Sequence, residues 1–513
     1  MSLNDLNSDI KEYILGKFAE DDSGPYMFHS FLLLNREWSE IAVKFLYKDT
    51  WIFIKRISNE KLRAKQLIDT YLNCLPDSGI TTKYDYIEKA RNLHIPDLYE
   101  CVIYWEEETQ FEDDQLRGYD QSRIKNIFFK LFRAFIQRSN LKKCTFAKSS
   151  LEAPHNPPIN DTHLHEIATR LHARNVQLNY LNLGYFPCTD DALLYLTGNI
   201  TYLKTFKVKM QTCSDQALAR FLRTQRALTK LKIRSGDNIS ETISALSSLS
   251  GTLVKLRILD CNLETHKRPF TSIATCTGLR SLYMYGTKFS REVSTSDLLM
   301  PIARNCTFHN VDFTGTILPG DVLASIAINS SSTLRRVFVK RPSEQFSQLE
   351  DDEFAVGINA LADHAKNLTD FACDILPEET TALLNLLNSI GHSLERLEIG
   401  SPALISRESS DLIRAIARNC SSLTTLDVSY FSFSKEAFEE LIRGTRIQNL
   451  DLRKTHSIDD ALLKIMKEVW DGTLQCLIIS ECENVSENAI SDLDWVEDVV
   501  TDITERRVLD EEI

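Results

Sequence analysis

The segment "LTKLKI" at residues 228–233 recurs in similar form as "LVKLRI" at residues 253–258. In both copies an apolar residue is followed by two other residues, a second apolar residue, one polar residue and a third apolar residue. The last three positions alternate, as the residues of a short half-buried β-strand do. The copies begin 25 residues apart. The sequence therefore indicates a repeating unit that contributes one strand per copy.

The same pattern continues on both sides of these two copies. Further copies begin at Leu178, Leu203, Leu279, Phe308, Leu334, Leu368, Leu394, Leu423, Ile447 and Leu474, and a weaker one begins at Leu141. Most of the intervals are 24–29 residues long. The longest interval, 34 residues, contains "KRPSEQFSQLEDDEF" at 340–354, which we expect to form a projecting loop.

The segments between the strands have helical spacing, as in "DDALLYLTGN" at 190–199 and "KEAFEELIRG" at 435–444. Hydroxyl residues precede several of these segments, at Thr189, Ser214, Ser434 and Ser486. A side-chain oxygen at that position accepts a hydrogen bond from the first turn of a helix. We therefore expect one strand and one helix in each repeat.

A strand and a helix within 20–29 residues resemble the leucine-rich repeat, most closely its cysteine-containing type. "LVKLRILDCNL" from Leu253 and "LQCLIISECENVSENAI" from Leu474 carry the likeness best. The resemblance implies an α/β fold: a curved solenoid with a parallel sheet on its concave face and helices on its convex face. The pentapeptide "IARNC" occurs at 302–306 and 416–420, and we expect each copy to end a helix and to bury Cys306 or Cys420.

The first fifty residues do not fit the repeat, and their apolar residues fall at helical spacing. They resemble the F-box family, in "LNSDIKEYILGKF" at 6–18 and "LLLNREW" at 32–38. Leu6, Asp9, Ile10, Ile14 and Phe18 match its first half, and Leu34, Asn35, Arg36, Trp38 and Ala42 match its second half. Two positions depart from the family pattern: Asn7 stands in place of Pro, and Asn35 in place of a frequent Cys.

This resemblance implies a substrate receptor of an SCF-type cullin–RING ubiquitin ligase. The residues expected to bind the adaptor subunit, and through it the cullin and RING subunits, are Leu6, Ile10, Ile14, Phe18, Leu34, Trp38 and Ile41. In that reading the repeats hold the protein to be ubiquitinated and this chain is not an enzyme. Two alternatives remain: a leucine-rich-repeat scaffold or inhibitor without a ligase, and a helical module that only caps the solenoid.

We divide the chain into a helical module at 1–51, a connecting region at 52–140 that also caps the N-terminal end of the solenoid, the solenoid at 141–493, and a C-terminal cap and tail at 494–513. The connecting region contains an acidic stretch, "YWEEETQFEDDQ" at 104–115, that we expect to be a solvated loop. It also contains an apolar helical segment at 122–140, which we expect to cover the open N-terminal edge of the sheet.

The alternation also predicts which strand residues face solvent on the concave side. The basic ones are Lys207, Lys209, Lys230, Lys232, Arg234, Lys255 and Arg257. Later strands place Asp312, Asp370, Asp374, Glu398, Asp427 and Asp451 there. One interpretation is that exposed strand positions are simply polar and that lysine prevents aggregation. The other is a bipolar groove whose basic part binds an acidic or phosphorylated substrate, with Tyr283, Tyr285 and Phe338 as aromatic anchors.

The composition argues against several other functions. A net charge of −13 does not favour binding to nucleic acid, and no apolar run is long enough to cross a membrane. The twelve cysteines include no C-x-x-C pair, so we expect buried thiols in a cytoplasmic or nuclear protein. Phosphate-loop, dinucleotide, zinc-protease and serine-hydrolase motifs do not occur. His163, His165 and His172 fit a polar helix face better than a metal site, and we expect no cofactor.

Overall fold

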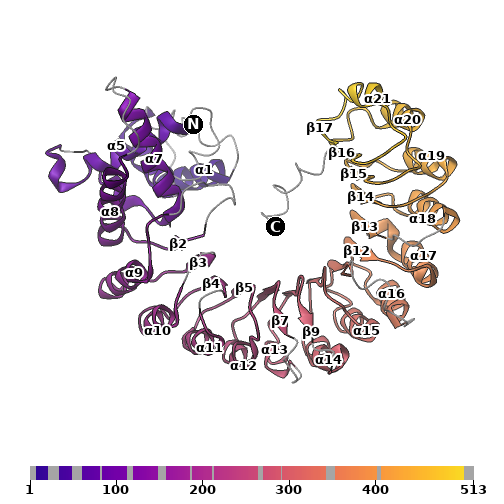
Figure 1. The fold of residues 1–513 in the computed structure, drawn as a ribbon, viewed down its shortest axis with the longest axis horizontal. Helices are drawn as coiled ribbons and strands as arrows, with labels where there is room; N and C mark the ends of the chain where they lie inside the picture. The colour runs from indigo at the N-terminus through magenta and orange to yellow at the C-terminus, as the bar shows by residue number, and fades with distance from the viewer. Residues whose placement is uncertain are drawn as a thin grey trace. The chain divides into compact units, whose positions relative to one another are not determined.

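The computed structural model describes residues 7–20, 34–48, 60–80, 82, 84–111, 120–147, 157–184, 186, 188–210, 213–263, 270–289, 292–342, 353–400 and 406–501. The chain divides into two compact units, Met1–Ile233 and Arg234–Ile513. Figure 1 shows that the strands of each unit form one layer and that most of its helices form a second layer. Each unit is therefore described by itself.

The first unit contains the N-terminal helices and the first repeats. Its helices are α1 (Ser8–Glu20), α3 (Arg36–Leu46), α5 (Glu60–Asn73), α6 (Tyr86–Lys89), α7 (Ile95–Phe111), α8 (Gln121–Arg138), α9 (Asp161–Ala173), α10 (Asp190–Asn199) and α11 (Asp215–Thr224). Its strands follow one another in sequence order: β1 (Asn92–His94), β2 (Lys143–Thr145), β3 (Tyr180–Gly184), β4 (Thr205–Lys209) and β5 (Lys230–Arg234).

The second unit repeats the same arrangement. Its main sheet contains β6 (Lys255–Leu259), β8 (Ser281–Tyr283), β10 (Asn310–Asp312), β11 (Arg336–Val339), β12 (Asp370–Asp374), β13 (Arg396–Gly400), β14 (Thr425–Asp427), β15 (Asn449–Asp451), β16 (Cys476–Ile478) and β17 (Asp498–Val500), all parallel. A two-stranded parallel sheet joins β7 (Asn262–Leu263) to β9 (Lys288–Phe289).

The helices of the second unit connect these strands. They are α12 (Ser240–Ala245), α13 (Thr271–Ala274), α14 (Thr295–Asn305), α15 (Gly320–Asn329), α16 (Glu353–His364), α17 (Thr380–Ile390), α18 (Ser406–Asn419), α19 (Lys435–Gly444), α20 (Asp460–Trp470) and α21 (Glu487–Ser491). Because successive helices contact each other beside successive strands, the apolar faces of neighbouring repeats form a continuous core. The fold is a parallel α/β solenoid of the leucine-rich-repeat type, as the spacing predicts.

The predicted strand at each of the twelve strong copies of the pattern is confirmed. The central apolar residues are in register across neighbouring strands, as in the pairs Leu256–Leu282 and Leu426–Leu450. These four side chains are buried. Lining up one buried residue per repeat fixes the register, because a slip by one residue would turn the apolar row to solvent.

The predicted helix caps are also confirmed. The side chains of Thr189, Ser214, Ser434 and Ser486 each accept a hydrogen bond from the backbone N–H three residues further on, which belongs to an alanine in every case. Both "IARNC" segments end a helix, α14 and α18, and both bury their cysteine. All twelve cysteines are free thiols.

Three expectations about the region before the strong repeats are wrong. The sheet begins at β1, well before residue 141, so the repeats start within 52–140. Residues 104–111 of the acidic stretch belong to helix α7, where Trp105 and Glu106 are buried. Helix α8 contacts α9 and belongs to the helical layer, so it does not cover the edge of the sheet.

Lys48, two residues after α3, is hydrogen-bonded to the start of this edge instead. The carbonyl of Lys48 accepts hydrogen bonds from the backbone N–H groups of Arg91 and Asn92, both at 3.1 Å. The carbonyl of Arg91 accepts hydrogen bonds from the backbone N–H groups of Lys142 and Lys143 in the same manner, so Lys48 occupies the place of a preceding repeat.

Two predicted segments lie largely outside the described residues. They are most of the loop at 340–354, from 343 to 352, and the tail from 502 to 513.

The expected polar cap at 494–513 begins differently. Residues 498–500 form β17, which pairs with β16, so the sheet continues into this segment. Among the described residues, no helix is both long enough and apolar enough to cross a membrane.

Candidate functional site

The exposed face of the second unit's sheet is the candidate site. Residues at equivalent positions of neighbouring strands form one row across it: Arg257, Tyr283, Asp312, Phe338, Ala372, Glu398, Asp427 and Asp451. Apolar residues on either side of each of these point into the core, as the alternating burial of β6 and β13 shows. The row therefore displays charged and aromatic side chains on a rigid backbone.

At its β6 end the row combines two cations with an aromatic ring. Lys255 Nζ lies 4.8 Å, and the Arg257 guanidinium carbon 4.6 Å, from the centroid of the Tyr283 ring. All three side chains are half-buried, and Tyr285, two residues after Tyr283, is 47% exposed. A cation over an aromatic face is attracted by the ring quadrupole.

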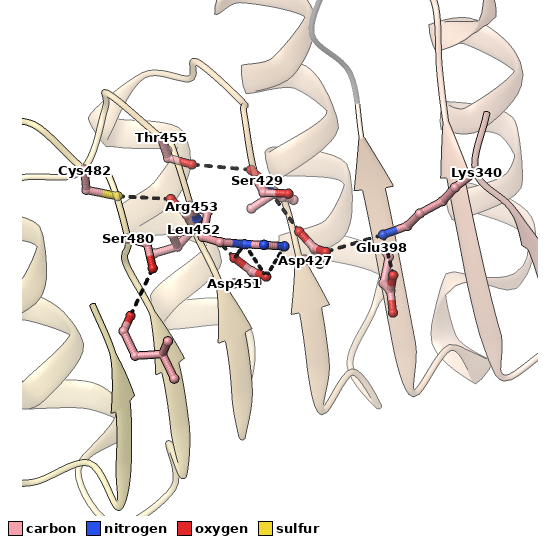
Figure 2. A network of polar contacts seen from close by, with 12 residues as sticks. Lys340, Glu398, Asp427, Ser429, Asp451, Leu452, Arg453, Thr455, Ser480 and Cys482 are labelled. Carbon is pink, nitrogen blue, oxygen red and sulfur yellow. Dashed lines mark hydrogen bonds and ion pairs between the residues drawn. The ribbon is translucent and has the colours of Figure 1, made fainter. Parts of the chain in front are cut away.

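Further along the row, from β11 to β15, the charges neutralise one another (Figure 2). Lys340 Nζ lies 2.5 Å from Glu398 and 3.5 Å from Asp427, two and three strands away from its own. The strand between carries Ala372 at the facing position, whose methyl group leaves room for the lysine to pass. Gly400 leaves similar space, because a Cβ there would clash with Asp374.

Burial and charge together set the protonation of this network. Burial disfavours the ammonium of Lys340, but Asp427 and Glu398 outweigh that effect and raise its pKa. Burial likewise disfavours the Glu398 and Asp427 carboxylates. Lys340 outweighs this effect together with Arg396 at Glu398, and together with Ser429 and Arg453 at Asp427, so both pKa values are lowered. For Asp374 desolvation prevails over the nearby Lys340, so its pKa is raised.

Two arginines complete this neutralised part of the row. The Arg396 Nε donates to Glu398 at 2.7 Å, and the Arg453 Nε donates to both oxygens of Asp451 at 3.1 Å (Figure 2 shows the second pair). Asp427 and Asp451 are buried, at 8% and 4% exposure. The expectation that these two carboxylates face solvent is therefore wrong, because their cations and the turn residue Ser429 enclose them.

The predicted substrate-binding residues fall into separate groups. Lys207, Lys209, Lys230 and Lys232 lie on β4 and β5 of the first unit, where the Lys207 ammonium is 5.4 Å from the ring of Tyr180. Arg234 begins the second unit and forms an ion pair with Asp260 at 2.9 Å. Phe338 is grouped with Arg396, whose guanidinium carbon is 5.6 Å from its ring, and not with Tyr283. Their role in binding stays a prediction.

The N-terminal helices are a second candidate surface. Leu15, Trp38, Ile41 and Ala42 form their core, so the structure does not support direct contact of Trp38 or Ile41 with a partner. Ile10 and Leu34 are 44% and 50% exposed, and Ile14 is half-buried. Leu6 and the side chain of Phe18 lie outside what the structure describes.

The sequence patterns do not reveal two features of these helices. Lys11 is buried, with its ammonium 2.6 Å from Glu37 and 5.6 Å from the centroid of the Trp38 ring. Tyr13, which the family pattern does not mark, is 67% exposed.

The histidine group has a structural explanation. His163 stacks on Phe129 with ring centroids 4.8 Å apart, and His165 stacks on Tyr195 at 4.3 Å. Within the described residues, no three His, Cys, Asp or Glu side chains are placed to hold a metal ion.

Comparisons with known proteins add little to this geometry. No protein-family model matches the chain, and no curated protein matches its sequence. Among solved structures, a chain of the Rad7 and Elc1 complex in yeast is 14% identical with a TM-score of 0.36, over 64% of this chain and 86% of that one. The internalin InlF from Listeria monocytogenes is 15% identical with a TM-score of 0.35, over 72% and 87%. Structural similarity at this level does not support a conclusion about function.

Proposed function

We propose that this chain is the substrate-recognition adaptor of an SCF-type ubiquitin ligase. In this proposal the N-terminal helices dock on the adaptor subunit, which links them to the cullin and RING subunits. The repeats hold a protein substrate, so the chain contributes proximity and the bond-forming chemistry belongs to its partners. Such a complex would work in the cytoplasm or the nucleus.

The exposed apolar side chains of the N-terminal helices carry this proposal. Ile10, Tyr13 and Leu34 are solvent-exposed although the core beside them is already filled by Leu15 and Trp38. Side chains that the module does not need for its own packing are available to a partner. The hydrogen bonds from Arg91 and Asn92 to Lys48 fix this module to the first repeat, so a docked adaptor would be held in a defined place on the first unit.

The test is a binding measurement with the full-length chain and the purified adaptor subunit of an SCF complex. The double variant Ile10→Lys, Leu34→Lys is expected to lose the complex while keeping the thermal stability of the parent. Ile80→Lys is the matched control, because Ile80 is 55% exposed in the same unit but outside the helical pair. Trp38→Ala is unsuitable as a docking test, since it would open a cavity in the core.

The second candidate is a leucine-rich-repeat scaffold or inhibitor with no ligase attached. The charged and aromatic row on the second unit's sheet favours it, because that surface suits a protein partner whether or not the N-terminal helices dock. If the intact chain forms no complex with the adaptor subunit, the ligase proposal fails and the scaffold remains.

A further inference from the structure

The exposed face of the first unit's sheet carries lysines on three of its strands. Within the described residues from 141 to 233, no aspartate or glutamate lies on a strand. The lysines of these strands are Lys143 on β2, Lys207 and Lys209 on β4, and Lys230 and Lys232 on β5. Their positions alternate with buried residues, so their side chains project from the face opposite the core.

The carboxylates of the same repeats lie in the helical layer. Within the described residues from 141 to 233 they all belong to α9, α10 and α11, at Asp161, Glu166, Asp190, Asp191 and Asp215. Asp161 and Asp190 accept hydrogen bonds from the hydroxyls that begin the next helix, Thr189 and Ser214. Figure 1 shows α9 to α11 and β3 to β5 in separate layers. These repeats therefore place negative charge on the helices and positive charge on the sheet.

Two of the lysines stand at the ends of one row across the strands. Strand pairing places Lys143 beside Tyr180 and Tyr180 beside Thr205. Lys230 continues this row on β5, because its N–H donates to the carbonyl of Lys204, one residue before Thr205, at 2.9 Å. Neighbouring strands are about 4.8 Å apart, so the backbones at Lys143 and Lys230 are separated by about 14 Å.

The third lysine lies between these two. The Lys207 ammonium is 5.4 Å from the centroid of the Tyr180 ring, and both side chains are half-buried. Lys143 and Lys230 are exposed. None of the three lysines forms an ion pair with a described residue. Like charges on nearby strands repel one another, so the arrangement adds no stability and suits an anionic partner.

We propose that Lys143, Lys207 and Lys230, with Tyr180 between them, bind an acidic, extended segment of the protein substrate. The ammonium groups pair with carboxylates of the segment, and the tyrosine ring contacts its apolar atoms. An extended chain advances about 3.3 Å per residue, so carboxylates about four residues apart would reach both ends of the row. This inference rests on the proposed protein-binding function and names the class of substrate.

The experiment measures binding of the full-length protein to three labelled probes at low salt. One is a flexible Gly/Ser peptide with glutamates about four residues apart, one is the same peptide with glutamines, and one is an oligothymidine with the net charge of the first. We expect the glutamate peptide to bind about tenfold more tightly than the glutamine peptide, and more tightly than the oligothymidine. Equal binding of the two peptides would overturn the proposal. Tighter binding of the oligothymidine would also overturn it, because the surface would then suit nucleic acid.

Two matched variants locate the binding surface. The first replaces the three lysines by glutamine: Lys143→Gln, Lys207→Gln and Lys230→Gln. The second removes the same charge from exposed positions of the first unit that lie outside the strands: Lys125→Gln, Arg220→Gln and Arg226→Gln. The first variant should reduce the preference for the glutamate peptide to about twofold or less, and the second should retain it. Equal losses in the two variants would mean that only the total charge matters, and the surface would be refuted.

The peptide measurement uses the purified chain alone, so it does not depend on the ligase. The variant without the three lysines is expected to bind the adaptor subunit as the parent does. Absence of adaptor binding with an intact preference for glutamate would count against the ligase alone. Absence of the preference with intact adaptor binding would count against the basic surface alone.

Discussion

Tyr430 is a bulky residue in a backbone conformation that favours glycine. Its φ is +68°, and the residues four positions after the central apolar residue of other repeats, Gly286 and Gly315, have φ values of +58° and +70°. The turn is needed because the Tyr430 N–H donates to Arg453 O of the next repeat at 2.8 Å. The Lys454 ammonium, 5.3 Å from the ring, offsets part of the strain.

This predicts an unusual order of stability for two variants. Tyr430→Ala and Tyr430→Gly both lose the ring, but only glycine relieves the left-handed backbone. We expect Tyr430→Gly to be about 1 kcal/mol more stable than Tyr430→Ala in urea unfolding. This difference is the strain energy of alanine in the left-handed conformation minus the extra chain entropy that glycine loses on folding. An alanine variant as stable as the glycine variant would contradict this expectation, because the strain of alanine would then be no larger than the extra chain entropy of glycine.

Lys340 is the residue on which the neutralised part of the sheet depends. Lys340→Met would leave Glu398 and Asp427 without their shared cation, and we expect a loss of about 2–3 kcal/mol at neutral pH. Lys467→Met, which breaks an exposed ion pair with Asp494, should cost less than about 1 kcal/mol. Urea unfolding of the two variants measures both values.

The loss at Lys340 should also depend on pH. Lys340 lowers the pKa of both carboxyls in the folded state, so its contribution is present above their unfolded values near 4 and disappears as the pH falls through the lowered folded values. Without Lys340, burial favours the protonated acids. The deficit of Lys340→Met should therefore shrink between pH 7 and about pH 4, and a constant deficit would contradict this account.

At the scale of the element, the helix caps allow a direct test. Ser434 begins α19 and accepts a hydrogen bond from the Ala437 N–H at 3.2 Å. Ser434→Ala should reduce the free energy of unfolding by about 1 kcal/mol, and Ser434→Thr should retain most of it because the hydroxyl remains. Equal losses for the two variants would indicate that packing, and not the cap, determines the effect.

The same scale shows what the sequence could predict. The twelve strong strands follow from their pattern because one buried residue per repeat defines the register. The pattern does not predict β1, because its unit reads "ARNLHI" and has Ala90 in the place of the first leucine. Ala90 is nevertheless buried, as the leucine is in other repeats. The alternating pattern also predicts which strand positions carry basic residues, but it does not predict the distances between their side chains and other groups. It could not show that Lys340 passes over Ala372, nor that Asp427 is enclosed.

At the scale of the whole molecule, each repeat contacts mainly its neighbours, so stability is a sum of local terms. Because the repeats share no single core, a change at one end of such an array need not alter the structure at the other end. We therefore expect the Ile10→Lys, Leu34→Lys variant of the N-terminal helices and the Lys340→Met variant of the second unit to act independently, so that their effects on the free energy of unfolding add in the combined variant.

The same locality predicts how the chain responds when its N-terminal helices are removed. A chain without residues 1–48 loses the Lys48 carbonyl that accepts from Arg91 and Asn92, and β1 becomes an exposed edge. Hydrogen exchange should accelerate at the amides of β1 and β2 and stay unchanged in β14 to β16, because the disturbance decays from repeat to repeat. Trp38→Ala in the full chain should produce the same local pattern by emptying the core of the helical pair. Accelerated exchange throughout both units would mean that the helices stabilise the array as a whole, and the helical module would then be inseparable from the fold.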